Sequence, residues 1–433
     1  MNNRRIINNT IWIVGCKIFR AILGMLVTML SARYLGPSGY GLISYAASIV
    51  TFVVPVMQLG LNSTLVQELV NDSQHEGKIM GTSIVMSMVS GAGCIVGVIA
   101  FSALTNPGEP VTTIVCGLYS IQLLFQALEQ IQYWFHAKLL SKYVSVTMLI
   151  AYGVTSGYKI LLLVLGSSVY WFALSQALDF FMISMILLVI YRQKGCDRLS
   201  FSWKLFRKMF ARSKYYIISN LMISVFAQTD RIMLKMMMDE TAVGYYSAAV
   251  TCAGMAGFVF EAIINSAQPV ILESARRGNA AMERAISALY SVVIYLSLGL
   301  CVVITVFSPL VIHILYGDQY GPAVQALRII VWYSTFSYLG AVRDVWILAQ
   351  WKQKYLLFIN LIGASANVVL NVAMIPLMGI NGAALASLVT QIFTNVVLGF
   401  VIKPIRRNNT LMIRGLNPTL MLHMLSDRKN RSR

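Results

Sequence analysis

Long apolar stretches separated by short polar breaks run through almost the whole chain. The hydrocarbon core of a membrane is about 30 Å thick, so a helix needs roughly 20 mainly apolar residues to cross it. About twelve stretches of this length are present. They begin near Thr10, Gly39, Gly81, Pro110, Tyr143, Val169, Tyr215, Val243, Ala285, Pro322, Tyr355 and Ile380. The pattern predicts an all-α integral membrane protein with about 12 transmembrane helices.

Composition supports this interpretation. Of the 433 residues, 58% are hydrophobic and 12% are charged. Soluble domains are usually about 45–50% apolar and about 25% charged. Because the predicted spans account for most of the chain, we expect no separate soluble domain.

The longest polar break divides the predicted spans into two equal groups. We predict an N-terminal six-helix lobe over residues 1–191, a basic cytoplasmic linker over 192–214, a C-terminal six-helix lobe over 215–402 and a basic cytoplasmic tail over 403–433. Within the linker, residues 200–210 mix aromatic, aliphatic and basic side chains, as an amphipathic helix on a membrane surface does. An even number of spans per lobe gives both lobes the same orientation and puts both termini on one side.

The basic residues are unevenly distributed between the two sides. The net charge of +18 would by itself fit either nucleic acid or an anionic membrane surface. If the N-terminus is cytoplasmic, Arg33 and Lys235 are the only Lys or Arg in predicted outer loops, whereas the linker and the tail are densely basic. This asymmetry satisfies the positive-inside rule. It predicts that both termini are cytoplasmic and that the basic clusters contact membrane lipids, with no nucleic acid as partner.

Residue types that carry catalysis or bind metals are scattered. The 6 cysteines occur singly, without the paired spacings of zinc or disulfide sites. The 4 histidines show neither zinc-ligand spacing nor a Ser/His/Asp arrangement. The predicted outer loops are also too short for an outer catalytic domain. We therefore expect no metal, no cofactor and no enzymatic activity.

Several short motifs resemble those of one family of carriers. Residues 32–41 look like the first outer loop of bacterial polysaccharide flippases, the Wzx-type carriers of O-antigen and capsule repeat units. Further similar stretches follow in the expected order at residues 230–234, 243–249, 315–320 and 371–384. These carriers belong to the multidrug/oligosaccharidyl-lipid/polysaccharide flippase superfamily.

The resemblance covers roughly residues 5–402. It implies two lobes around a central cavity, alternating access, and a polyprenyl-diphosphate-linked saccharide as cargo. The chain would then carry repeat units from the inner to the outer leaflet of the bacterial cytoplasmic (inner) membrane for surface polysaccharide synthesis. Other polysaccharide-assembly proteins are further candidate partners.

Three other functions fit parts of the pattern. A multidrug or cation antiporter of the same superfamily would favour an acidic interior, whereas basic residues slightly outnumber acidic ones in the predicted spans. A membrane polysaccharide polymerase would need a sizeable outer loop, and the predicted outer loops are short. A scaffold for polysaccharide assembly would use the basic tail over residues 403–433 as a docking arm.

Basic residues inside the predicted spans are candidates for binding the diphosphate, because an ionisable group in the membrane commonly faces a cavity or a partner. Lys17 and Arg20 share a helix face with Gly24 in the first span. They either receive the diphosphate or extend towards the cytoplasmic head groups. Arg231 could bind phosphate as a fork of donors, and Arg343 is the further candidate.

Amides at helical spacing are candidates for binding hydroxyl-rich sugars. Gln122 and Gln126 share a face of the fourth span, and Asn367 and Asn371 share a face of the eleventh. The alternative is that these amides hydrogen-bond one helix to another, which is the commoner use of such residues in membranes.

Three carboxylates inside the spans are candidates for coupling transport to an ion gradient: Glu129, Asp179 and Asp230. A carboxylate that takes up a proton or cation in one conformation changes the relative stability of the two states. Asp230 has an alternative structural role, in which it neutralises a neighbouring cation or anchors its span.

Overall fold

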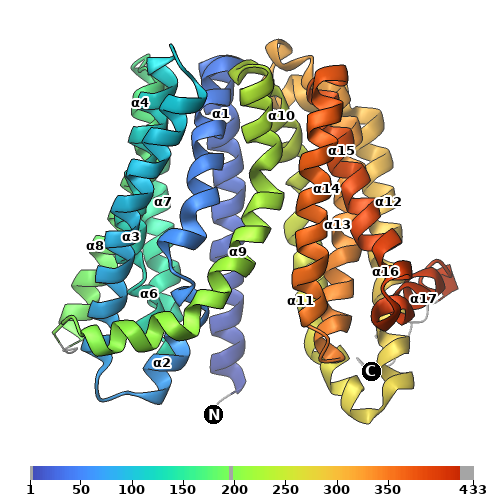
Figure 1. Cartoon of the computed structure of the whole chain (residues 1–433), viewed down its shortest axis with the longest axis horizontal. Coiled ribbons are helices and arrows are strands. Elements are labelled where there is room, and N and C mark those ends of the chain that lie inside the picture. The colour runs from blue at the N-terminus through green and yellow to red at the C-terminus, as the bar shows by residue number, and fades with distance from the viewer. Residues whose placement is uncertain (1–2, 195–197, 420–433) are drawn as a thin grey trace. The chain divides into compact units, whose positions relative to one another are not determined.

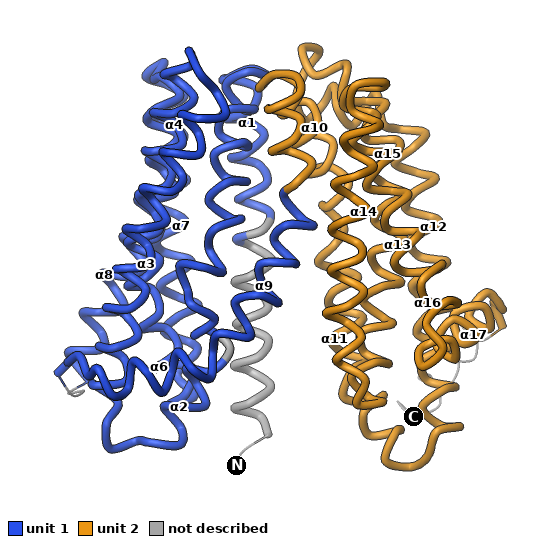
Figure 2. Tube along the Cα trace, viewed as in Figure 1, with its two compact units in different colours: residues 1–228 blue, residues 229–433 orange. Residues whose placement is uncertain are grey.

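The chain folds into two compact, wholly helical units. The computed structural model describes residues 3–194 and 198–419, apart from the side chains of residues 3–19, 21 and 63. One unit comprises residues 1–228 and the other residues 229–433 (Figure 2). Over the described ranges no residue belongs to a β-strand. This is the all-α membrane architecture that the hydropathy pattern predicts.

The first unit consists of antiparallel helices of very different lengths (Figure 1). They are α1 (Asn3–Met57), α2 (Leu65–Asn71), α3 (Glu76–Thr105), α4 (Pro110–Ser120), α5 (Gln122–Glu129), α6 (Gln132–Ala137), α7 (Ser141–Val164), α8 (Val169–Gln193) and most of α9 (Trp203–Met237).

The second unit begins within α9. Its further helices are α10 (Glu240–Gly254), α11 (Gly257–Arg277), α12 (Asn279–Tyr316), α13 (Ala323–Ala349), α14 (Lys354–Met378), α15 (Ile380–Ile392), α16 (Leu398–Val401) and α17 (Arg406–Arg414). A π-helical turn, Phe393–Val397, joins α15 to α16. Short 3₁₀ turns lie at Leu61–Ser63, Asp318–Tyr320 and Lys403–Ile405.

The helices are long enough to span a membrane many times. Within the described part of the chain, eight helices are long and apolar enough to cross a membrane, or up to nine if the bent pair α10 and α11 forms one span. The 55-residue α1 contains two of the expected spans, because Gly36 leaves the helical conformation with φ 68° and ψ 176°. This positive φ favours glycine, and the two parts of α1 run in opposite directions (Figure 1). The other expected spans lie in α9 and α13, which are 35 and 27 residues long.

The first part of α9 runs across one end of the first unit, and the helix then bends to run alongside the other long helices (Figure 1). Hydrogen bonds hold this first part in place. The buried Glu68 of α2 accepts hydrogen bonds from Lys208, at 3.1 Å, and from Arg212. Burial raises the pKa of the Glu68 carboxyl, but hydrogen bonds and attraction from the two cations outweigh it and hold that pKa below its usual value. Just before α9, the Ser200 amide donates to the Gly77 carbonyl at 3.2 Å.

Aromatic side chains line the same part of α9. The rings of Trp203 and Phe206 stack at 4.6 Å, and Phe206 also stacks on Phe210. The Arg207 guanidinium lies 5.6 Å from the Trp203 ring centroid. Trp203 is 56% exposed, so this segment combines outward-facing aromatic and basic groups. That combination suits a membrane surface, and the boundaries predicted for the linker remain a prediction.

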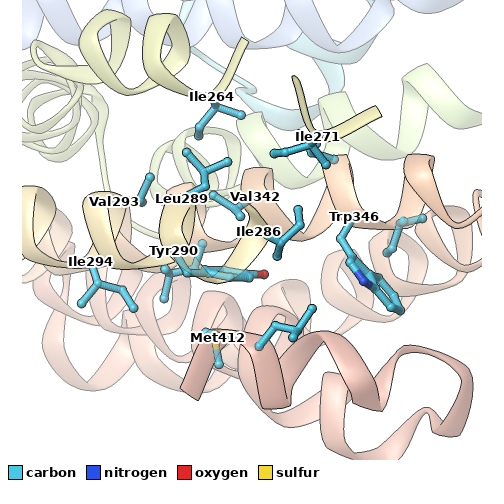
Figure 3. Close-up of a cluster of buried hydrophobic side chains, with 14 of the residues drawn as sticks. Ile264, Ile271, Ile286, Leu289, Tyr290, Val293, Ile294, Val342, Trp346 and Met412 are labelled. Carbon is cyan, nitrogen blue, oxygen red and sulfur yellow. The ribbon is translucent and has the colours of Figure 1, made fainter. Parts of the chain in front are cut away.

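The second unit has an apolar core to which α11, α12, α13, α14, α16 and α17 contribute buried side chains (Figure 3). The Tyr290 ring of α12 is fully buried there, and its hydroxyl donates to Asn408 of α17 at 3.1 Å. The other labelled members come from α11, α12, α13 and α17: Ile264, Ile271, Ile286, Leu289, Val293, Ile294, Val342, Trp346 and Met412.

We expect Glu68→Gln to loosen the start of α9. Glutamine keeps the shape but removes the charge to which Lys208 and Arg212 donate. Because both cations are about half exposed, the expected loss is about 1 kcal/mol. The measurement is hydrogen–deuterium exchange of residues 203–214 at neutral pH. We expect faster exchange of these residues in Glu68→Gln. The control variant Glu273→Gln, which alters the exposed pair with Arg277, should leave their exchange unchanged.

The same contact should depend on pH in the unaltered protein. A carboxyl whose folded pKa is lowered stabilises the fold fully above its unfolded pKa, here 4.5, and this stabilisation is lost as pH falls through the folded value. Exchange of residues 203–214 should therefore rise as the solution is acidified below pH 4.5, relative to Glu68→Gln. Parallel pH profiles for the two proteins would show that Glu68 does not hold this segment.

Candidate functional site

An arginine and an aspartate from distant parts of the sequence pair inside the first unit. Arg20 of α1 donates from Nη2 to Asp179 Oδ2 of α8 at 3.3 Å. The Asp179 side chain is 2% exposed, whereas that of Arg20 is 34% exposed. The guanidinium also lies 5.1 Å from the centroid of the Tyr152 ring, and Thr155 donates to Asp179 Oδ1 at 3.5 Å. Lys17, the other cation predicted on this face, has its side chain outside the described residues.

Two further ionisable residues surround this pair. Glu129 of α5 is buried, and Arg20 and Asp179 both act on it electrostatically. Lys159 lies one helical turn beyond Thr155 on α7 and acts electrostatically on Asp179. The first unit thus gathers two basic and two acidic residues that the sequence places in four separate spans. Two of the three predicted coupling carboxylates, Glu129 and Asp179, belong to this group.

The predicted amides of the first unit lie on α5. Gln122 is buried and Gln126 is partly exposed. A third amide of this region, Gln130, was missed by sequence reasoning. Ser83 donates to its Oε1 at 2.5 Å, and its Nε2 donates to Ser87 at 2.6 Å. Gln130 therefore ties this segment to α3, which is the interhelical use expected of amides in membranes.

A second polar cluster lies inside the second unit, around Asp230 of α9, which is 7% exposed. Its carboxylate accepts hydrogen bonds from Asn371 at 2.7 Å and from the hydroxyls of Tyr246 and Ser387. Asn371 also donates to Asn367 Oδ1 at 3.1 Å. The structure thus joins three predicted residues, Asp230, Asn367 and Asn371, in one network spread over α9, α10, α14 and α15.

Among the described residues, the hydrogen-bond donors to Asp230 are neutral side chains. A buried carboxylate is costly unless hydrogen bonds and opposite charge offset its desolvation. The buried Oδ1 of Asn371 has no hydrogen-bond partner in the described part of the chain, so a second oxygen beside the carboxylate is available. Carboxylate, amide and hydroxyl oxygens are the ligands that hard cations prefer. This arrangement could hold a small cation or a proton.

Arg343 of α13 has a different environment. It is 4% exposed and donates from Nη1 to the Thr394 carbonyl at 3.0 Å and to Asn395 Oδ1 at 2.8 Å. Its Nη2 donates to the neighbouring Asp344 at 2.9 Å. Thr394 and Asn395 belong to the π-helical turn, where the regular backbone pattern is interrupted. Arg343 therefore holds α13 against this turn, and its binding of substrate stays a prediction.

Sequence reasoning missed several residues that form hydrogen bonds with the predicted charged residues of the second unit. Arg231, a predicted phosphate ligand, donates from Nε to Ser247 at 3.1 Å. Tyr246 and Ser247 stand in the motif at residues 243–249, so that motif was the available signal. Ser387 and Asn395 offered none, because single polar residues in an apolar span are common.

Known proteins resemble this chain over most of its length. Residues 6–275 match the family model described as polysaccharide biosynthesis protein. A search of the curated proteins found no match.

Several solved transporter structures have a similar fold. The inward closed conformation of the lipid II flippase MurJ aligns with a TM-score of 0.70 and 16% identity, over 96% of this chain and 93% of that one. An inward-facing multidrug resistance MATE family transporter of the MOP superfamily aligns with a TM-score of 0.69 and 14% identity, over 90% and 95%. A MOP superfamily transporter from Pyrococcus furiosus aligns with a TM-score of 0.55 and 14% identity, over 92% and 96%.

At sequence identities of 14% to 16%, the similarity to these solved structures shows a shared fold. The family model, in contrast, matches the sequence itself over more than half of its length. The chain is therefore a multi-pass membrane protein with the fold of MOP superfamily transporters, and it belongs to the polysaccharide biosynthesis protein family.

Proposed function

We propose that this protein is a flippase that moves polyprenyl-diphosphate-linked oligosaccharides from the inner to the outer leaflet of the bacterial cytoplasmic membrane. Its family and the fold that it shares with a lipid II flippase support a lipid-linked cargo. The observation that carries the proposal is Arg20 of α1, next to the candidate membrane span Ile22–Met57, whose guanidinium remains one-third exposed while Asp179 accepts a hydrogen bond from one of its nitrogens. A guanidinium binds phosphate through a planar fork of donors.

The proposed cycle keeps charge out of hydrocarbon. The diphosphate and sugar enter a polar cavity at the inner leaflet, and Arg20 binds the diphosphate while the prenyl tail stays among the lipids. A change between inward-open and outward-open states then releases the head group outside. Because the charged head group always has polar partners, the large cost of moving it through hydrocarbon is avoided. No bond forms or breaks in this cycle.

Asp230 is the proposed coupling residue. A proton or small cation that binds Asp230, Asn371 and Ser387 would neutralise this carboxylate, whose hydrogen-bond donors are neutral side chains. A ligand shifts a conformational equilibrium only by its difference in affinity between the two states. If the hydrogen bonds around Asp230 break in one of the two conformations, the ion binds more tightly to the other conformation. An ion gradient can then drive the cycle.

A multidrug exporter is the second candidate, favoured by the likeness in fold to a MATE family transporter. A cationic drug would need an available carboxylate. In the first unit, Asp179 already holds Arg20, and Arg20 also acts on Glu129. These contacts reduce the attraction for a cation and favour an anionic cargo.

The first test is the sidedness of the lipid-linked saccharide in cells. An impermeant reagent that modifies sugars reports the amount at the outer face. Cells without the protein should lose this signal, and Arg20→Ala should reproduce the loss, because removing a charged hydrogen-bond partner costs about 1.5–3 kcal/mol, or roughly ten- to a hundred-fold in binding. Arg277→Ala, at an exposed position, is the matched control.

Unfolding is a competing explanation for such a loss, because Arg20→Ala leaves the buried Asp179 without its partner. The double variant Arg20→Ala/Asp179→Asn removes both charges and should fold, yet still fail to move the saccharide. Unchanged sidedness in the absence of the protein would favour drug export or a scaffold role.

The second test is Asp230→Asn in proteoliposomes. Asparagine keeps much of the side chain's shape but cannot carry the charge that a proton or cation neutralises. Transport should therefore lose its dependence on an imposed proton or sodium gradient, while binding of inorganic diphosphate to the first unit is retained. Gradient dependence that survives in Asp230→Asn would exclude this residue as the coupling site.

A further inference from the structure

Asp179 lies between two basic residues of the first unit. Tyr152, Thr155 and Lys159 are spaced by three and four residues along α7, so they share one face of that helix. Arg20 contacts Tyr152, and Asp179 contacts Thr155. At a rise of 1.5 Å per residue, Lys159 lies about 6 Å further along the helix axis than Thr155. The order along α7 is therefore Arg20, Asp179, Lys159.

Asp179 accepts a hydrogen bond from only one of the donor groups of Arg20. This hydrogen bond measures 3.3 Å, and a guanidinium offers five N–H donors. Arg20 remains 34% exposed, so an incoming anion can reach it, whereas Asp179 is 2% exposed. Asp179 therefore needs another partner if Arg20 turns to a ligand, because an unpaired buried charge is strongly unfavourable. Lys159 is the cation that already acts on it from the other side.

We infer that Asp179 is an exchangeable counter-anion that makes the site selective for diphosphates over phosphodiesters. Without cargo it occupies Arg20; when a diphosphate binds Arg20, Asp179 pairs with Lys159. The inference rests on the proposed function and adds a specificity-determining residue to it. Asp179 does not bind the cargo but competes with it.

Competition from Asp179 would keep phospholipid head groups from occupying Arg20. Phospholipid head groups are far more abundant than any lipid-linked saccharide, and their phosphodiester carries one negative charge. A diphosphate diester carries two. Coulomb attraction scales with the product of the charges, so the diphosphate gains about twice as much from Arg20 as a phosphodiester does. Only the stronger anion then displaces a carboxylate that is already in place.

Neighbouring groups act in the same direction. Glu129 is buried near Arg20 and Asp179, and when it is ionised it adds negative charge beside the site and further disfavours weakly charged anions. The Tyr152 ring faces the Arg20 guanidinium and keeps it oriented without neutralising it. Arg20 can therefore change its anionic partner without leaving its place on α1.

The experiment compares two soluble probes on the full-length protein in nanodiscs: inorganic diphosphate and glycerophosphoglycerol, a phosphodiester with one charge. The unaltered protein should prefer diphosphate. Asp179→Asn should bind the phosphodiester about ten-fold more tightly and lose most of the preference, because the phosphodiester, unlike diphosphate, does not displace Asp179 and gains most when this carboxylate no longer occupies Arg20. Asp179→Glu should retain the preference, and Glu273→Gln, in an exposed Arg–carboxylate pair, should change nothing.

A double-mutant cycle tests the exchange itself. Lys159→Met should weaken diphosphate binding when Asp179 is present, since the displaced carboxylate then has no second partner. The same change should have little effect in Asp179→Asn, and this non-additivity would be absent if Lys159 were merely structural. Thermal unfolding of each variant confirms that it is folded.

The outcomes separate this inference from the proposed function. If Arg20→Ala abolishes diphosphate binding but folded Asp179→Asn keeps the full preference, the exchange is overturned and the flippase proposal stands. If folded Arg20→Ala binds diphosphate like the unaltered protein, the phosphate site is misplaced and both fail. Weaker diphosphate binding by folded Asp179→Asn would also overturn the exchange, because Asp179 would then support the ligand and not compete with it.

Discussion

A charge buried within a membrane protein must have a partner, and this requirement organises both units of the molecule. Moving an unpaired ionised side chain out of water costs several kcal/mol or more even after relaxation, roughly the whole stability of a domain. Asp179 lies in the candidate membrane span α8, Arg20 lies next to the span Ile22–Met57, and Asp230 and Arg343 lie in the long helices α9 and α13; each of the four is hydrogen-bonded. The contacts that satisfy them hold together helices far apart in the sequence.

The two units meet this requirement in different ways. In the first, basic and acidic side chains face one another, so the pair of Arg20 and Asp179 is nearly neutral but can be divided by a stronger ion. In the second, neutral hydroxyl and amide groups donate hydrogen bonds to Asp230, and the described contacts do not include an ion pair with this carboxylate. The first arrangement suits an exchangeable anion and the second a bound cation or proton. We therefore propose that cargo and coupling ion bind in different units.

Arg343 illustrates a third solution. Its guanidinium binds a backbone carbonyl and an amide within the π-helical turn, where the chain departs from regular α-helix. A backbone group released from the regular helix pattern must find another partner in a membrane. The cation and the irregular turn thus stabilise each other, which makes a packing role for Arg343 sufficient to explain its burial.

The sequence by itself determined that this is a multi-pass helical membrane protein, because the length and apolarity of a span depend only on residues close together in the chain. It also picked out most of the buried charges, since an ionisable residue in an apolar stretch is conspicuous. It could not determine their partners: Arg20 meets Asp179 across 159 positions, and Asp230 meets Asn371 across 141. Helical periodicity identifies the face on which a side chain lies but not the helix that packs against it. Ser387 became visible as part of a site only in the tertiary structure, because a lone hydroxyl has no distinguishing pattern until packing brings a carboxylate to it.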